Sequence, residues 1–110
     1  MPEPDMSSFL AHLQHIDAHY VYTPTHFRNG CGDDAIDNAA GVNEGSCKIF
    51  AYARLQGLSE ADTLALFGEH YAQVRAHPEG SDHANIRRFM RDGWAGISFT
   101  AQALQKRELP

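Results

Sequence analysis

The start of a strongly apolar segment, residues 46–56, holds the residue types with the most chemical potential in this chain. If Asn43 caps a helix there, the unpaired backbone amides of Glu44, Gly45 and Ser46 point outward at the positive end of the helix dipole. Gly45 has no side chain and would let a ligand approach this backbone closely. The sequence therefore predicts an anion site at the start of this helix.

Cys47 is the candidate nucleophile of the same helical turn. The helix dipole and the neighbouring Lys48 would both favour its thiolate, and a lowered pKa makes a cysteine reactive. A second segment, residues 82–87, supplies an imidazole, an amide and a guanidinium, which could act as a base, an orienting group and an anion clamp. The candidate catalytic residues are Cys47, His83 and Asn85. The candidate ligand-binding residues are Asn38, Asn43, Glu44, Gly45, Ser46, Lys48, Asp82 and Arg87.

We predict that these two polar segments meet in the fold, because buried polar groups need partners. Each residue also has a structural interpretation, which the sequence leaves open. Cysteine is among the most buried residue types, so Cys47 could serve packing alone. Asn43 and Asp82 are types that helix caps require, and His83 could be a hydrogen-bonded structural histidine. Solvent access of Cys47 and its distance from His83 discriminate between these interpretations.

Three histidines, His12, His15 and His19, have the spacing that aligns side chains on one face of a helix. Such spacing could hold a metal ion, but no thiol or carboxylate on that face completes a tetrahedral ligand set. We therefore expect a solvated polar flank, with no metal and no other cofactor.

Apolar periodicity predicts about five helices and a few short strands that position these residues. Helices are predicted over residues 5–18, 46–56, 59–76 and 81–93 and around Leu104, with Asp5, Ser59, Ser81 or Asp82, and Thr100 as N-caps. Strands are predicted at residues 20–23, briefly at 35–36 and at 97–99, with a turn at 28–30 and an irregular loop over 31–45. One core is predicted from Ile49, Phe50, Phe67, Tyr71, Ile86, Phe89, Met90 and Trp94. The result is an α+β fold with a small antiparallel sheet of two to three strands.

Composition limits the classes of protein that this chain can belong to. Its 110 residues fit one domain, and 43% hydrophobic with 21% charged residues is typical of a globular protein. We expect no membrane span, no cleaved signal peptide and a location in the cytoplasm. The net charge of −5 argues against nucleic-acid binding, despite a local basic cluster at residues 87–91. The sequence leaves open one bridge between Cys31 and Cys47, with two reduced thiols as the default expectation.

Several segments in order resemble one known family. They are NAAGVNEGSCKIF at residues 38–50, LALFG at 64–68, DHANIRRFM at 82–90 and GWAGISF at 93–99, with YTPTHFRNG at 22–30 similar as well. Together they resemble the HopJ type III effector family, so we interpret residues 1–110 as a single HopJ-like domain. The resemblance implies a small bacterial α+β protein associated by name with injection into host cells. It implies no established enzymatic mechanism.

Three functional hypotheses follow. In the first, the chain is a type III effector-like protein that acts by binding a host protein or a small anionic ligand in a cytosol. In the second, it is a cysteine-dependent acyl-transfer enzyme with Cys47 as nucleophile, His83 as base and Asn85 as the orienting group. In the third, it is a housekeeping protein that binds a small ligand and is not secreted. The sequence gives no oligomeric state.

Overall fold

A computed structural model describes residues 8–107 of the chain. Its elements in chain order are α1 (Phe9–His19), β1 (Tyr20–Tyr22), β2 (Phe27–Asn29), β3 (Ile36–Asn38), α2 (Glu44–Gln56), α3 (Glu60–Ala65), α4 (Glu69–Ala76), α5 (Ala84–Asp92), the 3-10 helix η1 (Gly93–Gly96), β4 (Ile97–Phe99) and β5 (Leu104–Lys106). Helices and small antiparallel sheets make up an α+β fold, as the sequence predicts.

The strands form two separate antiparallel sheets. A three-stranded sheet has the order β3-β2-β4, and a second sheet pairs β1 with β5. The predicted turn at residues 28–30 is wrong, because Arg28 and Asn29 lie in β2, the central strand. The predicted helix around Leu104 is also wrong, because residues 104–106 pair with β1 instead. That pairing satisfies backbone groups of β1 that a lone edge strand would leave free.

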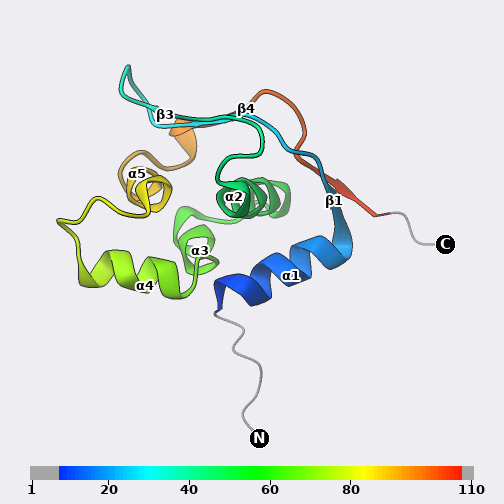
Figure 1. The fold of residues 1–110 in the computed structure, drawn as a ribbon, viewed down its shortest axis with the longest axis horizontal. Helices are drawn as coiled ribbons and strands as arrows, with labels where there is room; N and C mark the ends of the chain where they lie inside the picture. The colour runs from blue at the N-terminus through cyan, green and yellow to red at the C-terminus, as the bar shows by residue number, and fades with distance from the viewer. Residues whose placement is uncertain (1–7, 108–110) are drawn as a thin grey trace, which may run out of the picture.

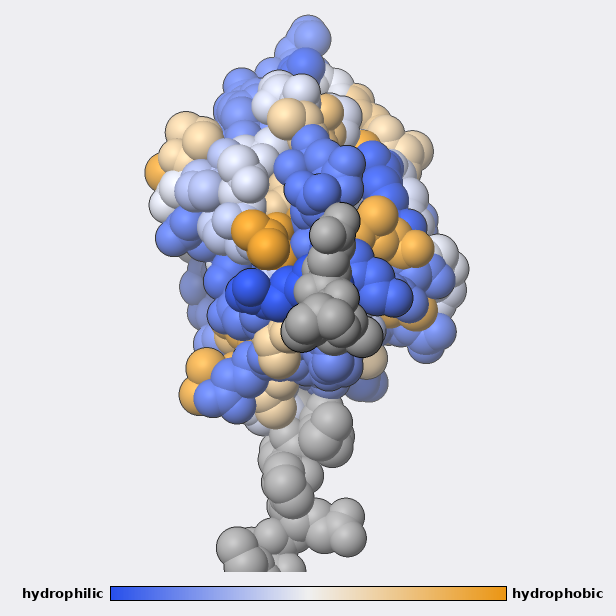
Figure 2. All heavy atoms as spheres, turned by 90° about the vertical axis from the view of Figure 1, so that its right-hand side faces the viewer, coloured by the Kyte–Doolittle hydropathy of each residue, from blue (hydrophilic) through white to orange (hydrophobic). Residues whose placement is uncertain are grey.

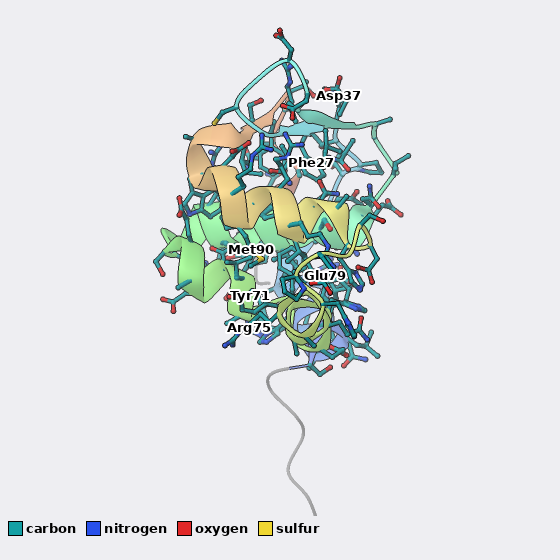
Figure 3. The ribbon with its side chains drawn as sticks, turned by 90° about the vertical axis from the view of Figure 1, so that its left-hand side faces the viewer. Phe27, Asp37, Tyr71, Arg75, Glu79 and Met90 are labelled. Atoms are coloured by element: carbon teal, nitrogen blue, oxygen red, sulfur yellow. The ribbon has the colours of Figure 1, made fainter. Side chains whose placement is uncertain are left out.

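The elements lie in layers around α2, as Figure 1 shows. The three-stranded sheet covers one side of α2 and α5, while α1, α3 and α4 lie on the other side. Figure 3 shows Phe27 of β2 between this sheet and the helices, where it is fully buried. The face that bears α1, β1 and β5 is mostly hydrophilic, with apolar residues scattered among polar ones (Figure 2). Scattered apolar residues of this kind are normal on a protein surface.

Local capping explains where the helices begin and break. Ser8 caps α1 by accepting a hydrogen bond from the Ala11 amide at 3.2 Å, so the helix begins later than predicted, and the predicted cap Asp5 lies outside the described residues. Ser59 caps α3 as predicted, through the Asp62 amide at 3.1 Å. The predicted single helix over 59–76 is interrupted at Gly68, whose φ of 55° favours glycine.

Phe50 of α2 is the centre of the hydrophobic core. It is 0% exposed, and its ring contacts four aromatic rings, those of Phe27, Phe67, Phe89 and Trp94. The predicted core residues Ile49, Phe50, Phe67, Ile86 and Phe89 are buried, and Tyr71 and Trp94 pack partly buried against them. Met90 is the exception: it is 46% exposed on α5, so its predicted place in the core is wrong.

Candidate functional site

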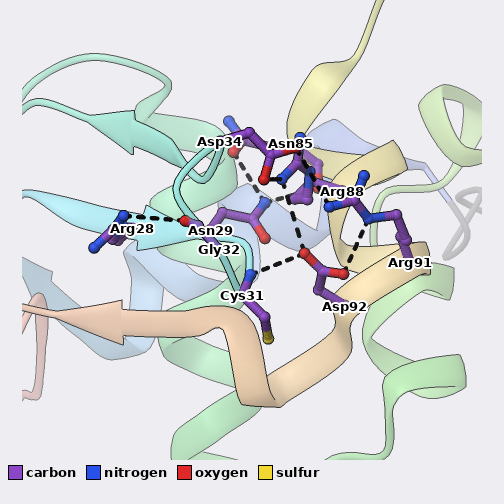
Figure 4. Close-up of polar contacts among 9 residues, drawn as sticks. All are labelled: Arg28, Asn29, Cys31, Gly32, Asp34, Asn85, Arg88, Arg91 and Asp92. Atoms are coloured by element: carbon purple, nitrogen blue, oxygen red, sulfur yellow. Dashed lines mark hydrogen bonds and ion pairs between the residues drawn. The ribbon is translucent and has the colours of Figure 1, made fainter.

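Four asparagines from different elements form a hydrogen-bonded cluster, the asparagine lattice: Asn29 of β2, Asn38 of β3, Asn43 before α2 and Asn85 of α5. Asn38 and Asn85 bond reciprocally, each Nδ2 donating to the other's Oδ1, at 3.1 and 2.9 Å. Nδ2 of Asn29 donates to the main-chain oxygen of Asn85 at 2.9 Å (Figure 4), and Nδ2 of Asn43 donates to Oδ1 of Asn38 at 2.7 Å. Asn29, Asn38 and Asn85 are buried, so the lattice fixes the start of α5 against the sheet and α2.

Asn43 and His83 occupy the N-cap positions of α2 and α5 with left-handed backbone. Their φ values of 54° and 51° are the only positive ones among the non-glycine residues of the described range. Between residues 8 and 107, neither side chain accepts a hydrogen bond from a first-turn amide. The predicted caps Ser81 and Asp82 are therefore wrong, because His83 takes that position. Two helix starts thus keep first-turn amides that no side chain caps.

A hollow of about 280 Å³ lies between these two helix starts. We call it the polar hollow, and it is lined by Ile36, Asn43, Ser46, His70, His83, Ala84, Asn85 and Ile86. Nε2 of His83 lies 2.8 Å from the Oε1 acceptor of Gln73, so Nε2 carries the hydrogen of that bond. The His70 ring lies 4.9 Å from the His83 ring, and its buried Nδ1 has no hydrogen-bond partner within residues 8–107.

The structure brings some of the sequence-predicted residues together and separates others. Asn43 and Ser46 meet His83 and Asn85 in the lining of the hollow, with Asn38 directly behind them. Asp82 and Arg87 instead form an ion pair at 2.6 Å that ties down the loop before α5. His70 was missed, although it follows Phe67 of the inner helical stripe by three residues. Asn29 was missed because the sequence was interpreted as a turn there.

Cys47 lies in an enclosed corner on another side of the first turn of α2. The residue is 1% exposed, and its Sγ donates to the Thr25 carbonyl at 3.7 Å. Burial raises the pKa of the Cys47 thiol, and this outweighs the opposite effects of hydrogen bonds with Tyr22 and Thr25 and of the Lys48 charge. The predicted lowering of this pKa is wrong, because removal of the thiolate from water outweighs the attraction of the Lys48 charge. Burial, with the nearby Cys47 and Glu44, also raises the pKa of Tyr22.

Glu44, Gly45 and Lys48 are not part of the polar hollow. A Cβ atom at Gly45 would lie 2.7 Å from the Phe9 ring, so Gly45 admits α1 rather than a ligand. Nζ of Lys48 pairs with Asp17 at 2.8 Å and lies 4.9 Å from the centre of the Tyr22 ring. These three residues hold α1 and β1 against α2.

The two cysteines are both free, Cys31 exposed and Cys47 buried. Cys31 belongs to a second polar cluster, where its amide donates to Asp92 at 2.9 Å (Figure 4). This hydrogen bond and the bond from Arg91 hold the pKa of Asp92 below its usual range. Asp34 pairs with Arg88 at 3.1 Å in the same cluster. The predicted basic cluster is therefore largely neutralised on this side of α5.

The histidines of α1 lie along one helix, with the rings of His15 and His19 4.5 Å apart. Within residues 8–107, no three His, Cys, Asp or Glu side chains gather closely enough to hold a metal ion. Over the same residues, no helix has the length and apolar character needed to cross a membrane.

The family model of the HopJ type III effector protein matches residues 1–104. The chain belongs to the HopJ family. Its structure is similar to the crystal structure of an unknown function protein, VPA0580, with a TM-score of 0.85 and 44% identity over 91% of this chain and 81% of that one. No curated protein matches the chain. Membership of the HopJ family suggests a type III effector-like protein, and the predicted resemblance is confirmed.

Proposed function

We propose that this HopJ protein acts by binding in a cytosol, and that its polar hollow takes a small ligand with a carboxylate or phosphate group. The observation that carries the proposal is the convergence of two helix starts, both without side-chain caps in the described range, on one hollow. Each start contributes unpaired amides and the positive end of a helix dipole, which favours a nearby anion by about 0.3–1 kcal/mol.

The charges around the polar hollow support an anion rather than a cation. Its lining contains two histidines and a serine hydroxyl but no carboxylate among the described residues. Of the nearest acidic residues in sequence, Glu44 lies beside Tyr22. Asp82 pairs with Arg87 at 2.6 Å, and its other carboxylate oxygen lies 3.9 Å from Nε2 of His83. An anion entering the hollow would therefore meet donors in its lining, while the one carboxylate near His83, that of Asp82, is already neutralised by Arg87.

The asparagine lattice supports the proposal because it fixes both helix starts. Asn38 and Asn85 hold β3 against α5, while Asn43 at the start of α2 bonds to the same Asn38. Donors held in place lose little conformational freedom when a ligand arrives, and this preorganisation favours affinity. A volume of about 280 Å³ suits a small molecule rather than a protein segment.

A titration followed by the backbone amide NMR signals of 15N-labelled protein tests this proposal. Inorganic phosphate and acetate are added at constant ionic strength, with chloride as the reference anion. We expect saturable shifts at Asn43, Ser46 and residues 83–86, which line the hollow where the two helices begin. Shifts that rise linearly without saturation, or that centre on the exposed arginines, would overturn the proposal.

A matched pair of histidine variants sharpens the titration. His83→Asn removes the imidazole but keeps a residue type that tolerates left-handed backbone, and it should weaken phosphate binding several-fold. His77→Asn, at an exposed histidine that ends α4, should leave binding unchanged. Equal effects of the two variants would contradict a role for the polar hollow.

The acyl-transfer alternative has little support from the geometry. A thiolate nucleophile must reach solvent and a base, whereas Cys47 is 1% exposed and its thiol pKa is raised. His83 bonds to Gln73 and lines the polar hollow instead.

Secretion into a host cell is a question separate from binding. The family description motivates the effector hypothesis, while the housekeeping hypothesis needs only the hollow and its ligand. A fusion of the full chain to a translocation reporter, expressed in strains with and without a working type III system, separates the two. Secretion-dependent signal in host cells supports the effector; its absence, with a control effector delivered, supports the housekeeping protein.

A further inference from the structure

A groove between α4 and α5, distinct from the polar hollow, combines apolar side chains with arginines. Its volume is about 460 Å³, and it is lined by Val74, Arg75, Pro78, Arg87, Met90 and Arg91. We call it the arginine groove. Figure 3 shows Met90, Tyr71 and Arg75 in a row beneath α5, on a single face of the molecule.

The apolar part of the arginine groove centres on Met90. This methionine belongs to the apolar stripe of α5 in sequence, yet it is 46% exposed beside the buried Val74. Methionine side chains are flexible and polarisable, and they adapt to apolar partners of different shapes. Met90, Val74 and Pro78 together provide a place for one large apolar side chain of a partner.

The charged part of the groove can receive carboxylates on either side of Met90. Arg75 lies 5.7 Å from the centre of the Tyr71 ring and pairs with no acidic residue in the described range. The Arg91 side chain is 59% exposed, although it also contacts Asp34 and Asp92. Arg87 is mostly committed to Asp82. Arg75 is thus the guanidinium group without an acidic partner, and Arg91 is a second one that a partner can reach, although Asp34 and Asp92 share its charge.

We propose that the arginine groove docks an acidic peptide segment of another protein that carries one large apolar residue between Asp or Glu residues. Charge complementarity selects this occupant: the chain as a whole has a net charge of −5, but the groove has arginines around an apolar floor. Arginine and methionine are also enriched in protein interfaces relative to other surfaces. The docking does not depend on the ligand of the polar hollow, because different residues line the two sites.

A peptide array tests the docking with the full chain. Each peptide has a central Leu, Met, Phe or Trp and four flanking positions. The set covers every arrangement of Asp and Glu over those four positions. Matched control peptides replace the acids by Asn and Gln, or the central residue by Ser. We expect a subset of the acidic peptides to bind and both kinds of control to fail.

Variants of the protein locate the binding in the groove. Arg75→Glu and Met90→Asp should each weaken the selected peptides by about tenfold or more. Lys106→Glu, on β5, and Leu55→Asp, at an apolar residue 52% exposed on α2, are the matched controls and should bind as the natural chain does. A peptide with Lys in place of one acid should bind Arg75→Glu better than it binds the natural chain.

Four results would overturn the docking. They are an array in which no acidic peptide exceeds its controls, equal loss of binding in Lys106→Glu, equal binding of the amide controls, and tighter binding of a labelled single-stranded oligonucleotide at the same groove. Circular dichroism of each variant confirms that a loss of binding is not a loss of fold.

Discussion

Two sides of the first turn of α2 hold similar chemistry in very different surroundings. Ser46 lines the polar hollow together with His70 and His83, around a space of about 280 Å³ that a small molecule could enter. Cys47, the next residue, lies in a corner that is closed by Tyr22 and the Thr25 carbonyl. Successive residues of a helix point about 100° apart, so one step along the chain separates the open side from the enclosed side.

This difference shows that burial, rather than residue type, decides which groups are available for chemistry. The sequence ranks Cys47 first because thiolates at helix starts are reactive. The structure removes its thiol from water, which disfavours the charged form. Asparagine side chains are less reactive than a thiolate, yet the asparagine lattice fixes the two helix starts that line the polar hollow.

The largest expected effect lies in the core that both sides share. Phe50→Ala removes a ring that is 0% exposed and contacts four other aromatic rings. It should lower the free energy of unfolding by about 3–5 kcal/mol, through lost burial and the cavity left behind. Chemical denaturation measures this loss, with Leu55→Ala at an exposed position of the same helix as the control. An unchanged denaturation midpoint would contradict the central place of α2.

The open side should be sensitive to loss of the asparagine lattice. Asn85→Ala removes the side-chain bonds of Asn85 with Asn29 and Asn38, although Asn29 keeps its bond to the main-chain oxygen of residue 85. The loss of these buried bonds should cost about 1–3 kcal/mol of stability. Asn43→Gly, at an exposed member of the lattice, keeps a residue that tolerates the left-handed backbone there and should cost less. A double-mutant cycle of Asn38→Ala with Asn85→Ala should give a coupling energy of at least about 0.5 kcal/mol. Additive effects would mean that the lattice does not act as a unit.

Gly45→Ala distinguishes a ligand contact at Gly45 from a packing contact with α1, because the two interpretations predict opposite changes in the free energy of unfolding. If a ligand approached Gly45, Gly45→Ala would stabilise the helix by about 0.5–1 kcal/mol. Because the added Cβ meets the Phe9 ring at 2.7 Å, we expect a net loss of about 1 kcal/mol instead. Thermal unfolding measures the sign. Combining Gly45→Ala with Phe9→Leu should recover part of the loss, and no recovery would point to another cause.

The main helical elements could be predicted from the sequence, because α2 and the inner residues of α5 follow strong apolar periodicity. The Ser59 cap could also be predicted, since its hydrogen bond depends on residues only three apart. Three features could not. The strand at Leu104 depends on pairing with β1, more than 80 residues away in sequence, and the break at Gly68 and the exposure of Met90 depend on how α4 packs against α5.

The candidate site could be predicted in part for the same reason. Asn43 follows from a helix start that local sequence marks. His83 and Asn85 follow from the polar segment before α5, although the helix cap is His83 rather than Ser81 or Asp82. Their meeting depends on long-range contacts between β3, α2 and α5, and so does the burial of Cys47. Asn29 has no local signal beyond its place two residues after Phe27, which is the spacing of side chains on one face of a strand.

The smallest expected effect concerns the buried Cys47 thiol, which should lower the free energy of unfolding at alkaline pH. A free cysteine has a pKa of about 8.5, and burial raises the pKa of Cys47 above its ordinary value in the folded chain. As pH rises through the unfolded-state value, the unfolded chain loses this proton while the folded chain keeps it, so the free energy of unfolding falls with pH. Denaturant titrations at about pH 8 and pH 9, on either side of the unfolded-state pKa, should show this loss in the natural chain and in Cys31→Ala, and a smaller loss in Cys47→Ala. A free energy of unfolding that rose over this interval only when Cys47 was present would indicate a thiolate in the folded state. Cys47 would then again be a candidate nucleophile.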